Sequence, residues 1–423
     1  MRLLLFGTFS LLFILGVPIP FALLGASAVY LWAAGVEPAV AALRMVNSLD
    51  SFVLLAVPLF LLAAQIMNEA GLTARVYRVA SLLVGHRRGG LAHVNVVSSI
   101  LFAGMTGSAI AEASGLGLIS IKAMTDAGYD RRFSAAVTST ASTIGPIIPP
   151  SIPLVIYAVV AGTSIEALFL GGVIPGLAMG LGTMLIIALL ARKRGYGAAE
   201  WPGWPALAAA TREAAPALLT PVILLGGMYS GFFTATEAAA VAVVYSLLIG
   251  GVLYRSLSFA QLGRMVRETA VTTSYLMLII STASVFGWIL AIERIPQDLA
   301  AWLTGVTQEP WQLLLILNVV FLLLGCVMDT NSILVIFLPV VLPAAQALGL
   351  DMVHLGVVLV LNLMIGLNTP PFGMLLFLTS GIARVPLGEL IRETRPFLAM
   401  LIVVLLLVTY FPQMVLWLPS LFK

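Results

Sequence analysis

The sequence GMTGS at residues 104–108, followed by TIGPIIPPS at 143–151, has a second version in GCVMDTN at 325–331 followed by IGLNTPP at 365–371. Gly104 and Gly325 lie 221 positions apart (325 − 104), and the same offset relates Gly145 to Gly366 and one Pro-Pro pair to the other. Both copies interrupt long apolar stretches. Non-helical backbone at membrane depth persists only where protein buries it or where it lines a polar cavity. Two copies at corresponding places in two halves therefore indicate a transport site.

The composition is that of a membrane protein with several spans. Of 423 residues, 61% are hydrophobic and 9% are charged, and the mean hydropathy is +1.10. Soluble domains carry about 25% charged residues. A net charge of +3 is too small to indicate binding of nucleic acid. The single cysteine, Cys326, excludes an intrachain disulfide or a cysteine metal cluster.

Each copy of the motif predicts a re-entrant helical hairpin followed by a broken transmembrane helix. The hairpins are expected at 91–125 and 311–348, and the broken helices at 133–160 and 352–380. The rest of the chain is predicted to repeat one plan. The expected segments are 1–90 (first-repeat scaffold helices and a surface arm helix), 91–195 (first-repeat transport part), 196–214 (an amphipathic linker), 215–308 (second-repeat scaffold helices and a surface helix) and 309–423 (second-repeat transport part with the last span).

The basic residues predict the orientation of the two halves. Arginine and lysine concentrate on the cytoplasmic side of membrane proteins, and the first hairpin is flanked by Arg87, Arg88, Lys122, Arg131 and Arg132. The second hairpin is flanked by Glu309 and Asp351 instead, so it is expected to enter from the outer side. Five full crossings and one hairpin in each half make the second half an inverted repeat of the first. The fold class is therefore an all-α polytopic membrane protein with both termini outside.

The interrupted helices predict two sodium sites. Half-helices that end inside the membrane leave unpaired backbone groups, and carbonyl, hydroxyl and amide oxygens form a suitable cage for Na⁺. The first site is expected from Gly104, Thr106, Ser108, Thr143, Gly145 and Ile148, and the second from Gly325, Asp329, Asn331, Gly366 and Thr369. Substrate contacts are expected from Thr106, Ser151, Asp329 and Asn368. Any one of these small residues could instead serve helix packing, and Ser108 could simply cap the outgoing half-helix.

Three acids lie in the apolar parts of the chain, and each has a functional and a structural interpretation. An ionisable group inside a membrane is a functional hypothesis by default. Glu237 belongs to the sequence Thr234-Ala235-Thr236-Glu237, which is typical of a capping box. Glu112 follows the first tip by one turn, where a negative charge also suits a helix N-terminus. Asp329 lies at the second tip and is predicted to bind a cation, a proton or the substrate.

At these residues the chain resembles the large membrane subunit of tripartite ATP-independent periplasmic (TRAP) transporters. The resemblance rests on segments 104–117, 145–151, 234–238, 328–331 and 366–373 and covers essentially the whole chain. It implies Na⁺-driven import of a small organic acid by an elevator mechanism, across the bacterial inner membrane. It also implies a periplasmic binding protein and a small four-helix membrane subunit. Because no four-span segment precedes the first apolar run, the small subunit is expected as a separate chain.

The sequence supports other functions less well than this one. The alternative within transport is a stand-alone ion-coupled elevator carrier of organic anions that needs no binding protein. A membrane enzyme would need a nucleophile with a base, or a metal cluster, at membrane depth, and the sequence has no such arrangement. A channel is disfavoured because broken, inverted hairpins suit alternating access better than a continuous pore. No organic cofactor is expected, and Na⁺ is the only expected ion.

Overall fold

The computed structural model describes residues 1–307 and 309–422; Gln308 and Lys423, which end the last two predicted segments, lie outside it. Every regular element among the described residues is a helix, so the predicted all-α class is confirmed. Long apolar runs without charges favour this outcome, because a helix satisfies all of its interior backbone hydrogen bonds within one segment.

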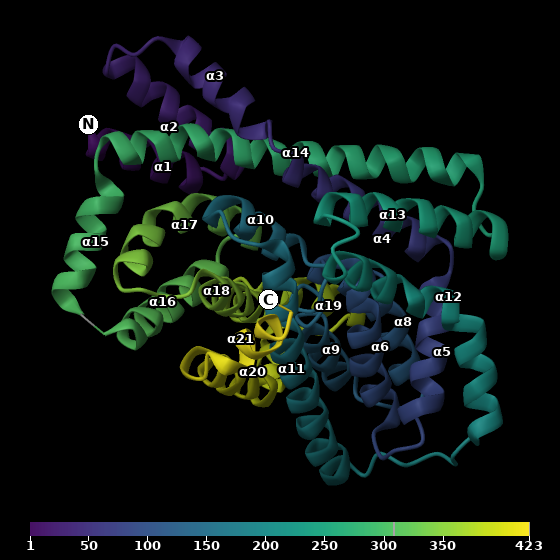
Figure 1. Cartoon of the computed structure of the whole chain (residues 1–423). Coiled ribbons are helices and arrows are strands. Elements are labelled where there is room, and N and C mark those ends of the chain that lie inside the picture. Colours follow the sequence, from purple (N-terminus) through teal and green to yellow (C-terminus); the bar gives the residue numbers. More distant parts are fainter. Residues whose placement is uncertain (308, 423) are drawn as a thin grey trace.

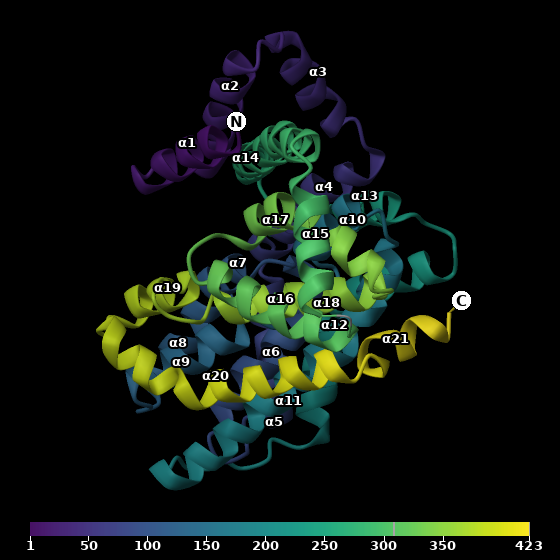
Figure 2. The same ribbon diagram turned by 90° about the vertical axis from the view of Figure 1, so that its left-hand side faces the viewer.

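Helices from both halves form an outer layer of the molecule. The first half supplies α1 (Arg2–Ile14), α2 (Ile19–Ala33), α3 (Pro38–Leu49), η1 (Phe52–Leu55) and α4 (Ala56–Glu69). The second half supplies α12 (Trp204–Tyr229), α13 (Ala235–Leu247), the π-helical η2 (Leu248–Leu253) and α14 (Phe259–Ile292). Helices of the two groups pack against each other: α4 packs on α13, and α2 packs on α14. In Figures 1 and 2, α14 lies with α1, α2 and α3 at one end of the molecule.

The first half then turns inward. The arm helix α5 (Leu72–Val84) packs on α6 and α12. The first predicted hairpin consists of α6 (Gly90–Thr106), α7 (Ala109–Ser114) and α8 (Leu116–Asp126), and α8 packs back against α6. The broken helix follows as α9 (Arg131–Ala141) and α10 (Ile152–Ala161), and α11 (Ile165–Arg194) ends the half.

The second half repeats this order. The connecting helix α15 (Ile295–Val306) leads to the second hairpin, α16 (Pro310–Gly325) and α17 (Thr330–Ala347), whose helices pack on each other. Its broken helix is α18 (Met352–Gly366) and α19 (Met374–Ala383), followed by α20 (Leu387–Tyr410) and α21 (Gln413–Ser420). In both views α20 and α11 lie at the end of the molecule opposite α14 (Figures 1 and 2).

Prolines explain the break between α9 and α10. In a continuous helix the N–H of residue i bonds to the carbonyl of residue i−4, and proline has no N–H. Pro146 and Pro149 therefore leave the carbonyls of Ser142 and Gly145 without their helical donors. The chain stays non-helical until Ser151, whose hydroxyl accepts a hydrogen bond from the Leu154 N–H at 3.2 Å and so starts α10.

The two halves interlock at the centre of the molecule. The second-hairpin helix α17 packs on α10, and α7 of the first hairpin packs on α19. Each hairpin thus contacts the broken helix of the other half. Asn368, in the second break, joins the two broken helices by hydrogen bonds to α9. It accepts from the Ser139 hydroxyl and donates to the Thr140 hydroxyl at 3.3 Å. All three residues are fully buried.

Six helices of the described chain are long and apolar enough to cross a membrane, or seven when α20 and α21, which meet at a 58° bend, count as one span. The other apolar helices are shorter, including α6, α16 and α18. The chain is therefore a multi-pass membrane protein by length and composition, while the expected ten crossings stay a prediction. The segment expected as a linker continues directly into the next helix, because α12 is unbroken from Trp204 to Tyr229.

Candidate functional site

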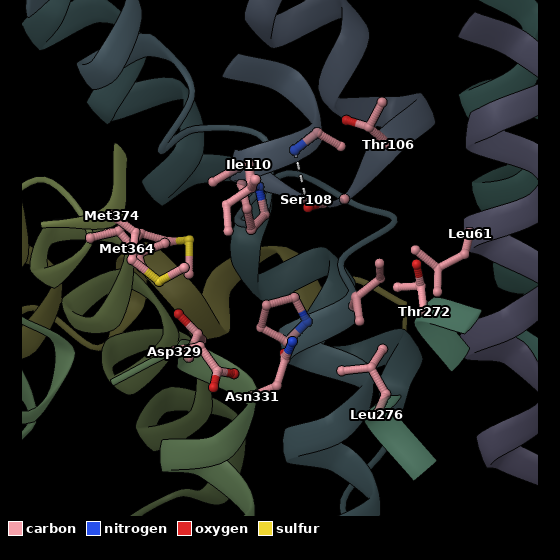
Figure 3. A pocket seen from close by; sticks show the side chains of 18 of the residues that line it. Leu61, Thr106, Ser108, Ile110, Thr272, Leu276, Asp329, Asn331, Met364 and Met374 are labelled. Atoms are coloured by element: carbon pink, nitrogen blue, oxygen red, sulfur yellow. Dashed lines mark hydrogen bonds between the residues drawn. The ribbon is translucent and has the colours of Figure 1, made fainter. Parts of the chain in front are cut away.

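A cavity of about 620 Å³ lies between the two hairpin tips (Figure 3). Figure 3 shows Ser108 and Ile110 of the first tip across the cavity from Asp329 and Asn331 of the second. The outer helices α4 and α14 close another side with Leu61, Thr272 and Leu276. The polar side chains of the lining are Gln65, Asn68, Thr106, Ser108, Thr272, Tyr275, Asp329, Thr330 and Asn331. Segments more than 200 residues apart in the chain thus contribute polar side chains to one cavity.

The first tip is a tight turn between α6 and α7. Gly107 has φ +57°, and a Cβ there would lie 2.5 Å from the Pro150 carbonyl oxygen of the adjacent break. Glycine is needed at this position because no other residue tolerates both the left-handed backbone and the close approach. Ser108 then accepts a hydrogen bond from the Ala111 N–H at 3.4 Å, which confirms its predicted capping role.

The second tip places a carboxylate at the start of α17. Asp329 is the N-cap residue, and its carboxylate accepts hydrogen bonds from the Ser332 N–H at 3.0 Å and from the Ser332 hydroxyl. The side chain is half-buried and also lines the cavity. Asp329 therefore combines the structural and the functional interpretations, since a carboxylate oxygen can accept more than one hydrogen bond or cation contact.

Two glycines hold the second tip against the second break. A Cβ on Gly366 would lie 2.7 Å from both the Cα and the carbonyl carbon of Gly325. These are backbone atoms, so no side-chain rotation could relieve the overlap. The spacing that the two copies share, from Gly104 to Gly145 and from Gly325 to Gly366, thus corresponds to direct backbone contact in the second half. In the first half the equivalent Gly104 instead faces Pro221 of α12.

Of the residues predicted for the two sodium sites, four line the cavity: Thr106, Ser108, Asp329 and Asn331. The other predicted residues are not part of the cavity lining. Thr143 donates to the Thr140 carbonyl at 2.6 Å, and Thr369 donates to the Ile365 carbonyl at 2.7 Å. The Ile148 N–H bonds to Ile144, and Gly145 abuts the carboxylate of Glu112.

Two of the residues predicted to contact substrate are not in the cavity lining. Asn368 bonds to α9 as described above, and Ser151 donates to the Pro146 carbonyl while it caps α10. Both are fully buried. Their polarity is therefore explained by the satisfaction of buried groups. The other two, Thr106 and Asp329, do line the cavity.

Several oxygens near the tips have no hydrogen-bond partner in the described structure. They are the hydroxyls of Thr106 and Thr330, the side-chain carbonyl of Asn331 and both carboxylate oxygens of Glu112. Buried polar atoms are seldom left unpaired, so each of these oxygens is available to a water molecule, an ion or a ligand. Hard oxygen ligands of this kind suit Na⁺. Among the described residues no group of three or more His, Cys, Asp or Glu could hold a metal ion.

The outer helices α4 and α14 also contribute polar residues to the cavity, which the repeated motifs did not indicate. Gln65 and Asn68 on α4, with Thr272 and Tyr275 on α14, bring polar groups to the cavity. A signal was present, because residues three apart share a helix face, and two amides on one face of an apolar span are unusual. Glu237, in contrast, closes a full capping box with Thr234, as its sequence predicted, and is exposed.

Interlocked halves, broken helices and a shared cavity with polar groups from both tips define the class: an all-helical membrane transporter. A family model for the "Tripartite ATP-independent periplasmic transporter, DctM component" matches residues 6–414. The chain belongs to this family, as the large membrane subunit of a TRAP transporter. The relatives are named as transport permeases, so the protein is a transporter and not an enzyme.

Curated relatives match along most of the chain. The sialic acid TRAP transporter large permease protein SiaM of Vibrio cholerae is 43% identical over 99% of this chain and 98% of its own. The C4-dicarboxylate large permease DctM of Pseudomonas aeruginosa is 41% identical over 90% of this chain and 89% of its own. The solved structure of the Alcanivorax borkumensis YdaH transporter shares the fold, with a TM-score of 0.66, 16% identity and 87% of each chain covered.

Proposed function

We propose that the protein imports a small organic acid across the bacterial inner membrane, driven by Na⁺. The observation that carries this proposal is the single cavity between two tips from opposite halves. The relatives named above, with an isethionate TRAP transporter permease of Oleidesulfovibrio alaskensis that is 39% identical over 96% of this chain, carry names of organic acids. Sialic acid, C4-dicarboxylates and isethionate are all anions, so the proposed substrate class is a small organic anion.

The lining of the cavity supports coupling to a cation. Among the described residues that line it there is no Lys, Arg or His, and Asp329 adds a negative charge. An anion entering this cavity would meet no positive side chain. Bound Na⁺ would supply the missing charge, together with the N-termini of the half-helices α10 and α17. Cation and substrate would therefore bind favourably together, which is the requirement for symport.

Membership of the family supports a proposal for the partners and for the movement. The TRAP name implies a periplasmic binding protein that delivers the substrate and a small membrane subunit. One relative is a fused DctMQ permease, of which this chain matches 65%. We propose that the small subunit is a separate chain here, that both termini are periplasmic, and that the inner helices move as an elevator against the outer layer formed by α1–α4 and α12–α14.

Uptake by reconstituted protein tests this function. Proteoliposomes containing the chain with its small subunit would be supplied with binding protein, a radiolabelled organic acid and a Na⁺ gradient. Uptake that needs both the binding protein and the gradient is expected. Full uptake by the chain alone with free substrate would favour the stand-alone carrier, and uptake that is indifferent to Na⁺ would refute the coupling.

Asp329 provides the residue-level test of this proposal. Asp329→Asn preserves the shape and the capping of α17 but removes the charge, whereas Ser108→Ala removes only a hydroxyl from the other tip. Since attraction between charges grows as the local dielectric falls, Asp329→Asn should raise the Na⁺ concentration needed for half-maximal uptake more than Ser108→Ala does. An unchanged Na⁺ dependence in Asp329→Asn would show that its charge does not hold the cation.

A further inference from the structure

Among the described residues, Glu112 is the only Asp, Glu, Lys or Arg that is fully buried. It lies on α7, one turn after the first tip, and its backbone N–H bonds to the Ser108 carbonyl at 3.0 Å. The side chain is 0% exposed, and neither carboxylate oxygen has a hydrogen-bond partner. None of the ion pairs among the described residues includes it. An ionised carboxylate cannot stay unpaired in an apolar interior without a large cost in free energy, so this one requires a counter-ion or a proton.

The Glu112 carboxylate packs against the first break and lies beside a hydroxyl of α6. Its Oε2 lies so close to Gly145 that a Cβ on Gly145 would overlap it, and the carbonyl oxygen of Ser142 is 3.8 Å from that same Cβ position. The hydroxyl of Ser99, on α6, lies beside the carboxyl but forms no hydrogen bond in the structure. The Ser99 hydroxyl of α6 and the backbone of the first break at Gly145 therefore both lie beside the Glu112 carboxylate of α7.

The prolines of the first break keep its carbonyls available. The N–H groups that would bond to the Ser142 and Gly145 carbonyls in a helix belong to positions 146 and 149, which are both proline. The structure shows no hydrogen bond to either carbonyl among the described residues. In the second break the situation differs, because the equivalent carbonyls of Leu363 and Gly366 accept from the N–H groups of Leu367 at 3.1 Å and Thr369 at 3.0 Å.

We propose that Glu112 is a direct ligand of a monovalent cation, Na⁺, bound between α7 and the first break. Its partners are the Ser142 and Gly145 carbonyls and the Ser99 hydroxyl. This inference rests on the sodium coupling proposed above and assigns the charged ligand of the first site. Each half then contributes one carboxylate, at positions that the repeat does not relate: adding 221 to 112 gives Ile333, and subtracting 221 from 329 gives Ser108.

Cation binding, measured apart from uptake, tests the assignment. The full-length chain, purified with any membrane subunit that copurifies, would be titrated with ²²Na⁺ at equilibrium, and its apparent melting temperature would be followed against Na⁺ with choline as the replacement. Glu112→Gln is expected to bind one Na⁺ fewer per protein, or to bind it about tenfold or more weakly, because the charge–charge attraction in a buried site is lost. Glu237→Gln is the matched control, since glutamine preserves the exposed capping box, and it should bind Na⁺ as the wild type does.

The outcomes separate the two proposals. If the wild type binds no Na⁺, the sodium coupling itself fails. If the wild type binds Na⁺ and Glu112→Gln binds it with the same stoichiometry and affinity, the coupling stands and the role of Glu112 is overturned, because the acid is then held by a proton. If Glu112→Gln does not fold, Glu112→Asp decides: it retains the charge on a shorter side chain, so weaker Na⁺ binding supports the assignment and unchanged binding overturns it.

Discussion

Alanine at position 366 should force apart two backbones that touch at the second tip. The added methyl carbon would lie 2.7 Å from the Cα and carbonyl carbon of Gly325 and 3.1 Å from its oxygen. Contacts below 3.0 Å with backbone cannot be relieved by side-chain rotation, and overpacking of this kind costs about 1–3 kcal/mol. Gly325→Ala should cost less, since its nearest contact is 3.2 Å, and Gly381→Ala, with no atom within 4 Å, is the control.

The control should be neutral or stabilising, because alanine favours a helix over glycine by up to about 1 kcal/mol. Apparent melting temperatures in detergent should therefore fall in the order Gly381→Ala, Gly325→Ala, Gly366→Ala, with the lowest value a few degrees below that of the wild type. Uptake should also need more Na⁺ in Gly366→Ala, because the tip shifts relative to the break. Equal stability and equal Na⁺ dependence of Gly366→Ala and Gly381→Ala would refute the described contact.

Three further predictions concern orientation, surface charge and the buried centre. In a Cys326→Ala background, an impermeant thiol reagent on intact cells should label Ala347→Cys and not Arg131→Cys; the reverse pattern would contradict the inverted repeat. The neighbouring Arg132 guanidinium lowers the pKa of Asp130, so the stability that this charge contributes is present above the unfolded pKa of about 3.9 and is lost as the pH falls through the folded pKa. Asp130→Asn should thus melt lower than wild type at pH 7, the gap should narrow as the pH falls below about 3.9, and a gap independent of pH would exclude this ion pair. Asn368→Ala should destabilise by about 1–3 kcal/mol, because the buried Ser139 hydroxyl loses its acceptor and the Thr140 hydroxyl loses one of its two partners, and an unchanged melting temperature would argue against these bonds.

Local sequence was sufficient to locate the interruptions of the helices. The order of hairpin, break and helix in each half follows from glycine and proline, which act through their own backbone geometry wherever they stand. The same holds for two of the caps, because Ser108 and the Thr234–Glu237 box bond to N–H groups within three residues of themselves. Interactions of such short range leave a direct trace in the sequence.

The composition of the cavity was decided only by tertiary packing. The repeat pointed to Asn368 and Ser151 as substrate contacts, yet packing pairs Asn368 with α9 and turns Ser151 toward its own break. It also brings Gln65 and Thr272 from the outer helices to the two tips, and Glu112 to Gly145. The positions of the two helix breaks are set along the chain, because capping and proline breaks depend on sequence neighbours. Tertiary packing sets which oxygens share one space, because that depends on how helices more than 200 residues apart rotate against one another.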